Sequence, residues 1–189
     1  MSLKLFRSTG YSSILSAGET RLAMHPGWVI AASSAWAGFA CNVALWRQLG
    51  LGDSPGLLGA LALGVLISGA CGAFLSVLGW RKTLKPAASL IVLLAALTAC
   101  ATWGQGLPVD AGLLQKRLFS LVLPPWASLL RWQVSALLVV LALVPLIWLW
   151  NVQVRRLPGP QQLGVNMTGT LTAALFAAAG GFLLFRHAL

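Results

Sequence analysis

Long runs of apolar residues, separated by short polar or turn-forming segments, dominate the chain. A helix needs about 20 apolar residues to cross roughly 30 Å of hydrocarbon. Runs that approach this length predict transmembrane helices at about 28–45, 57–79, 87–103, 129–150 and 165–185. A transmembrane β-barrel would instead show segments of about 10 residues with alternating polarity, whereas these runs are continuously apolar. The pattern therefore predicts an all-α membrane protein with five transmembrane helices.

Two prolines and one short turn give the spans their expected shape. Pro86 opens the third run, where a helix tolerates proline because the missing amide would have no partner there. Pro145 lies inside the fourth run and predicts a kink. The second and third runs are joined by a tight turn and are expected to form an antiparallel hairpin.

The segment between the third and fourth runs is too long for a simple connection. Residues 110–123 place apolar residues on one face with Lys116 and Arg117 beside them, which predicts an amphipathic helix in the headgroup layer. Its cations, together with Arg131, either contact lipid phosphates or simply anchor the helix at the interface.

Composition supports the membrane assignment. Charged residues make up 8% of the 189 residues and hydrophobic residues 58%, and the mean hydropathy is +0.85. A soluble protein has roughly 25% charged residues, so a soluble enzyme and a disordered chain are excluded. The net charge of +10 is explained by anionic headgroups at juxtamembrane positions, and we expect no nucleic-acid partner.

The distribution of Lys and Arg predicts the orientation. Eight of these residues lie in the N-terminal tail, the second-to-third turn and the fourth-to-fifth loop, and five lie on the other side. Short cytoplasmic loops retain the excess of cations, so residues 1–26 are expected to form a polar cytoplasmic tail. Residues 27–189 then form the five-helix domain, with the C-terminus in the periplasm. The first span resembles a cleaved signal only weakly, and we expect it to be retained.

Few side chains offer chemistry. His25 and His187 lie at opposite ends of the chain, and the three cysteines fall within predicted spans, so a metal site is not expected. The acids are Glu19, Asp53 and Asp110, which leaves no base to activate a nucleophile. Asn42 lies at membrane depth and is expected either to make an interhelical hydrogen bond or to mark a functional cavity.

Small residues recur at helical spacing in two spans. They favour close packing inside one bundle over a homodimer interface, because small side chains let membrane helices approach. The two stripes are Ser68, Gly72 and Ser76, and Ala173, Ala177 and Gly181.

The order of several short motifs resembles the N-terminal membrane domain of the lipid A phosphoethanolamine transferase family. The likeness covers roughly residues 28–187. The motifs are Asn42 with Leu45-Trp46, Lys85-Pro86, Gly106 with Val109-Asp110, Trp132 to Trp150 with Val144-Pro145, and Phe185-Arg186-His187.

The resemblance implies an inner-membrane domain that holds phosphatidylethanolamine as donor and lipid A as acceptor, in lipopolysaccharide modification. The family's zinc ligands and threonine nucleophile belong to a periplasmic catalytic domain and match no position here. We therefore expect no cofactor in this chain and no catalysis by it alone, and leave open whether it is part of an enzyme. Where the family has polar residues facing the headgroup, this chain has Lys116, Phe119, Ser120 and Pro124. The candidate lipid-headgroup residues are Asn42, Asp110, Lys116, Arg117, Ser120 and Arg131.

Two other functions remain open. A small transporter or channel subunit is favoured by Asn42 and by Pro145, but ionisable groups inside the spans, which mark ion pathways, are scarce. A structural membrane protein would instead bind a helical partner through the small-residue stripes.

Overall fold

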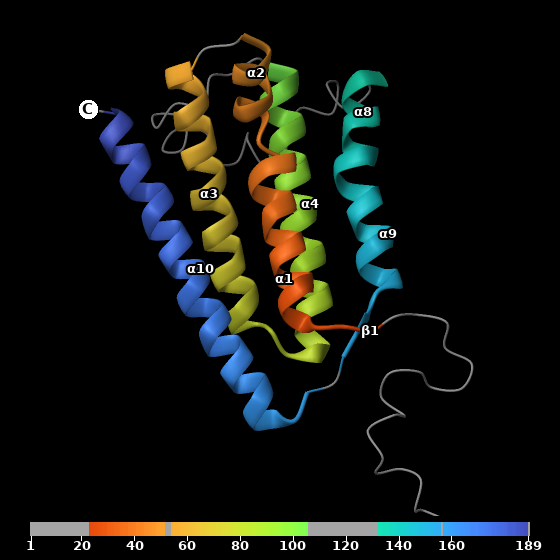
Figure 1. Cartoon of the computed structure of the whole chain (residues 1–189). Coiled ribbons are helices and arrows are strands. Elements are labelled where there is room, and N and C mark those ends of the chain that lie inside the picture. The colour runs from red at the N-terminus through yellow and green to blue at the C-terminus, as the bar shows by residue number, and fades with distance from the viewer. Residues whose placement is uncertain (1–22, 52–53, 106–131, 156, 189) are drawn as a thin grey trace, which may run out of the picture.

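The computed structural model describes residues 23–51, 54–105, 132–155 and 157–188. They form a bundle of helices (Figure 1). The α-helices are α1 (Pro26–Ala35), α2 (Val43–Leu51), α3 (Ser54–Val77), α4 (Arg81–Gln105), α8 (Trp132–Leu138), α9 (Val144–Asn151) and α10 (Gly159–Ala188), with π-helical turns η3 (Trp36–Ala40) and η4 (Val139–Leu143).

Helices long and apolar enough to cross a membrane confirm the all-α membrane class. In the described part of the chain there are four such segments, at Gly56–Val77, Lys82–Trp103, Trp132–Asn151 and Gly159–Arg186. A bent pair, Pro26–Ala40 with Val43–Gly50, raises the number to five if the pair is one span. The expected interfacial helix at 110–123 lies outside the described residues.

The first span is broken, not continuous as its hydropathy predicted. The helix passes from α1 through η3 and then bends by 51° before α2. Gly38 of η3 lies against α3 so closely that a Cβ built on it would be 2.5 Å from the Gly64 carbonyl oxygen. The Asn42 side chain accepts a hydrogen bond from the Leu45 amide at 3.2 Å, which caps the start of α2. Close contact and a capping side chain thus redirect the chain where apolarity alone predicted continuity.

A π-helical turn precedes Pro145, where the sequence predicted a kink. η4 ends at Leu143, and Pro145 is the second residue of α9. Proline removes one amide and its ring crowds the carbonyl four residues earlier, and a wider π turn relieves that crowding. The helix axis therefore continues as one span from Trp132 to Asn151.

Two helices begin earlier than their apolar runs. α4 begins at Arg81, so Pro86 lies inside the helix and not at its start. α10 begins at Gly159, six residues before the run expected from Val165. In both helices a polar first turn precedes the apolar run from which the span was predicted.

α3 and α10 make the most extensive contact between helices, side by side along their length (Figure 1). A Cβ on Gly72 would be 3.2 Å from the Ala173 Cβ, and one on Gly169 would be 2.8 Å from the Ser76 Oγ. The two small-residue stripes therefore face each other within one bundle. Gly180, rather than the expected Gly181, makes the close approach near the end of α10.

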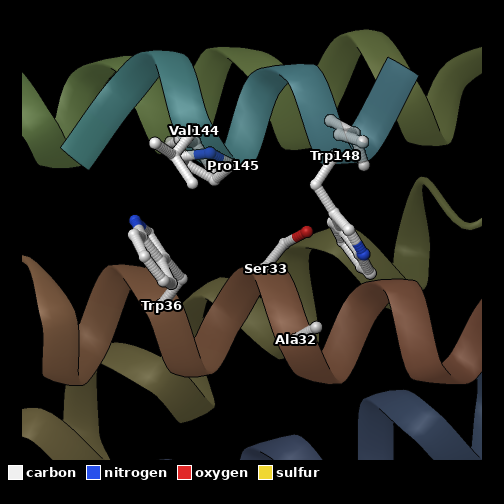
Figure 2. Close-up of a pocket in the computed structure, with 8 residues that line it drawn as sticks. Ala32, Ser33, Trp36, Val144, Pro145 and Trp148 are labelled. Carbon is white, nitrogen blue, oxygen red and sulfur yellow. The ribbon is translucent and has the colours of Figure 1, made fainter. Parts of the chain in front are cut away.

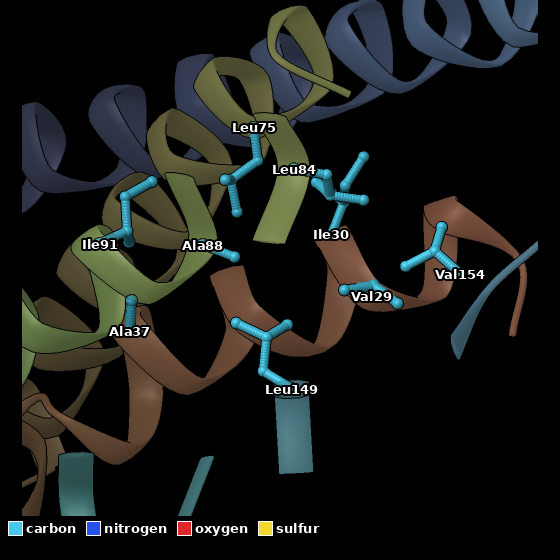
Figure 3. Close-up of a cluster of buried hydrophobic side chains, with 9 residues drawn as sticks. All are labelled: Val29, Ile30, Ala37, Leu75, Leu84, Ala88, Ile91, Leu149 and Val154. Carbon is cyan, nitrogen blue, oxygen red and sulfur yellow. The ribbon is translucent and has the colours of Figure 1, made fainter. Parts of the chain in front are cut away.

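A buried apolar cluster joins α1, α3, α4 and α9 toward one end of the bundle (Figure 3). At the same end, β1 (Ala23–Met24) pairs in parallel with β2 (Gln153–Val154), and the Arg155 amide donates to the Met24 carbonyl at 2.9 Å. We call this the β-end. The cluster contains Val29, Ile30, Ala37, Leu75, Leu84, Ala88, Ile91, Leu149 and Val154.

Candidate lipid-binding site

Asn42 is the one candidate headgroup residue that falls within the described residues. The other candidates, Asp110, Lys116, Arg117, Ser120 and Arg131, lie outside them. Asn42 occupies the break between η3 and α2, and its side chain is 6% exposed. Its role as a headgroup ligand stays a prediction.

The Asn42 amide binds the protein itself. Its Nδ2 donates to the Ala60 carbonyl of α3 at 3.0 Å, and its Oδ1 accepts from the Leu45 amide. A buried amide with partners on two elements stabilises the bend and joins it to α3. Of the two roles considered for Asn42, this geometry favours the interhelical hydrogen bond.

Arg47 adds a cation at the same end of the bundle, which we call the α2-end. Its guanidinium donates to the Thr102 carbonyl near the end of α4 at 3.0 Å and lies 6.0 Å from the centroid of the Trp103 ring. A cation there complements the partial negative charge of the α4 C-terminus. Arg47 was not among the candidate residues predicted from the sequence. Its position directly after Trp46, at the end of the first predicted span, could have indicated it.

An apolar groove lies between α1 and α9, and Figure 2 shows residues that line it. Its volume is about 310 Å³, at the lower end of the range for ligand sites. Val92 of α4 and Leu149 form buried parts of the lining, while Val144 and Trp148 are 51% and 37% exposed. The groove is therefore accessible from the surrounding membrane.

One wall of this groove is fixed by a hydrogen bond between the two π turns. The Trp36 indole Nε1 of η3 donates to the Leu141 carbonyl of η4 at 3.0 Å. π-Helical turns rearrange the regular hydrogen bonding of an α-helix. This bond thus holds η3 against η4 beside the groove.

Ser33 is the polar residue of the groove. Its side chain is 4% exposed, yet its hydroxyl points into the space between α1 and α9 (Figure 2). Within the described part of the chain the hydroxyl has no hydrogen-bond partner, whereas neighbouring Ser34 donates to the Ile30 carbonyl at 2.8 Å. A hydroxyl that opens onto a groove and has no acceptor in the protein can donate to a ligand there.

A second polar cluster lies at the β-end. Gln162 donates from Nε2 to the Gly79 carbonyl at 2.8 Å and to the Asn166 Oδ1 at 2.9 Å. The first bond joins α10 to the α3–α4 turn, and the second lies within α10. Gln162 lay in an expected loop because hydropathy placed the helix start too late. Its contacts hold helices together and do not indicate a ligand site.

The described residues contain no group of three or more His, Cys, Asp or Glu that could hold a metal ion. Cys41, Cys71 and Cys100 are all free thiols. The zinc that the resemblance attributes to the family has no ligand set in this part of the chain.

Comparison with protein families decides the identity of the fold. The model described as phosphoethanolamine transferase EptA/EptB, for the N-terminal domain, matches residues 67–189. The chain belongs to this family. No curated protein and no solved structure matches it.

The family membership confirms the resemblance and identifies the bundle as a membrane-anchoring domain of this transferase family. The match begins within α3 and extends to the end of the chain. Ser33, Asn42 and Arg47 precede it, so their roles must be argued from their own contacts.

Proposed function

We propose that the chain is the lipid-binding part of a phosphoethanolamine transferase, which holds phosphatidylethanolamine as donor and lipid A as acceptor at the outer leaflet of a bacterial inner membrane. The observation that carries this proposal is the family match over residues 67–189. The bundle of apolar helices supports it, because both proposed substrates are membrane lipids.

The positions of the described cations support an orientation with the N-terminus in the cytoplasm. Lys82, Lys85 and Arg155 lie toward the β-end, and Arg47 and Arg186 lie toward the opposite end. Cytoplasmic ends of membrane helices carry the excess of Lys and Arg. β1 and the end of α10 lie at opposite ends of the bundle (Figure 1), which suits an odd number of crossings.

This orientation places the α2-end at the periplasmic face. α4 ends and α8 begins at that end (Figure 1), so both chain ends that flank residues 106–131 meet there. The proposed headgroup ligands Asp110, Lys116, Arg117, Ser120 and Arg131 belong to that segment. Arg47 supplies a further cation for a lipid phosphate at the same face.

We further propose that these 189 residues bind and orient lipid but do not transfer phosphoethanolamine alone. Their acids are Glu19, Asp53 and Asp110 alone, and the described residues that line the groove carry no ionisable side chain. Transfer needs an activated nucleophile and a group that stabilises the leaving oxygen. Both would come from residues other than these.

Lipid A mass spectrometry tests the proposal directly. The chain is expressed in a bacterial strain that lacks its own phosphoethanolamine transferases, beside an empty vector and a complete transferase of the family. We expect lipid A without added phosphoethanolamine from the chain, and modified lipid A from the complete enzyme. Modified lipid A from the chain alone would overturn the non-catalytic assignment.

Lipid binding is tested separately with a photoactivatable phosphatidylethanolamine and peptide mapping. Labels on α2 and on residues 106–131 are expected. Labels confined to the β-end would contradict the proposed site.

A further inference from the structure

A cation lies at the β-end of the helices that line the groove between α1 and α9. Val92 in its lining and Lys85 lie seven residues apart on α4, so they share one helix face about 10 Å apart along the axis. The Lys85 Nζ donates to the Trp150 carbonyl at 3.4 Å and lies 5.9 Å from the Trp150 ring centroid. Trp150 directly follows Trp148 and Leu149 of the groove. These contacts hold an ammonium group at the β-end of the groove.

The Ser33 hydroxyl lies deeper in the bundle than this cation. Val29 and Leu84 belong to the same buried cluster, and Leu84 precedes Lys85. Ser33 follows Val29 by four residues, which is about 6 Å along the helix axis. From the β-end inward, the cation comes first, and the Ser33 hydroxyl then lies within the apolar groove, between Trp148 and Trp36 (Figure 2).

A glycerophospholipid presents complementary groups in the same order. Its phosphate comes first, its ester carbonyls accept hydrogen bonds next, and its acyl chains follow. The β-end favours an anionic headgroup, because Arg155 also lies there and none of the described residues is acidic.

We propose that the chain binds one anionic glycerophospholipid from the leaflet at the β-end. Its phosphate contacts Lys85, an ester carbonyl accepts from the Ser33 hydroxyl, and one acyl chain fills the part of the groove that runs from Ser33 toward Trp36. This site lies at the end opposite the proposed headgroup site and does not depend on the transferase assignment.

Native mass spectrometry of the full chain in detergent tests the site, with phosphatidylglycerol and phosphatidylcholine of identical acyl chains as probes. We expect the wild-type chain to retain phosphatidylglycerol preferentially. Lys85→Gln should weaken phosphatidylglycerol binding about fivefold, because a cation near an anionic lipid contributes about 1 kcal/mol, and should leave phosphatidylcholine binding unchanged. Lys85→Arg should retain the preference.

Ser33→Ala should weaken binding of both lipids about threefold, since both carry the ester carbonyl and such membrane hydrogen bonds are weak. Lys82→Gln is the matched control, with the same charge change at an exposed position, and should have little effect.

Three results would overturn the proposal. They are equal retention of the two lipids by the wild-type chain, equal effects of Lys82→Gln and Lys85→Gln, and unchanged binding by Ser33→Ala. The first result needs no variant, so the test stands even if Lys85→Gln fails to fold.

Discussion

At Gly180, one hydrogen atom in place of a methyl group lets α10 lie against the backbone of α3. A Cβ there would be 2.5 Å from the Leu66 amide nitrogen and 2.9 Å from the Ala62 carbonyl oxygen. Backbone atoms cannot rotate away as a side chain can, so the helices would have to separate. Gly180→Ala should therefore destabilise the bundle by about 1–3 kcal/mol.

The measurement is the unfolding free energy in detergent, with Gly164→Ala of the same helix as control. No atom lies within 4 Å of a Cβ built on Gly164, so that variant should be as stable as the wild type or slightly more stable. Equal destabilisation by the two variants would refute the close packing of α3 and α10.

Single residues also show where sequence reasoning reached its limit. Asn42 stood out because an amide at membrane depth needs a partner, but the identity of that partner, Ala60, depends on how α2 turns back toward α3. Ser33 did not stand out, because a serine in an apolar helix commonly donates to a carbonyl of the preceding turn, as Ser34 does. Only the rotation of α1 against α9 shows that Ser33 faces a groove.

At the scale of the helices, apolar runs located the membrane segments because the hydrocarbon thickness sets their length. The same reasoning missed the 51° bend in the first span and the π-helical turns. Both depend on contacts between helices, which a run of apolar residues does not encode. The polar first turns of α4 and α10 were missed because the apolar run of residues ends at the membrane interface. The helical backbone hydrogen bonds continue beyond that run.

The hydrogen bond between the π turns gives a prediction for these elements. Trp36→Phe removes the indole donor to the Leu141 carbonyl and keeps most of the apolar side chain. We expect a loss of stability of about 1 kcal/mol and faster hydrogen exchange in η4. Trp28→Phe is the control, because Trp28 is 68% exposed. Unchanged exchange in η4 would show that this bond does not hold the two spans together.

The two ends of the whole molecule differ in charge and in structure. Cations at the start of α4 and directly after β2 lie at the β-end, and the bend with Asn42 and Arg47 lies at the α2-end. This asymmetry supports the proposal that the headgroup site lies at the α2-end. The proposal requires the bent pair α1–α2 to cross the membrane as one span.

Fusing compartment reporters to both termini of the full chain tests this central claim most directly. One reporter is active only in the cytoplasm and the other only in the periplasm. Five crossings predict a cytoplasmic N-terminus and a periplasmic C-terminus. Both termini on one side would contradict the five-span bundle, and the reverse arrangement would place the α2-end in the cytoplasm, away from the proposed outer-leaflet substrates.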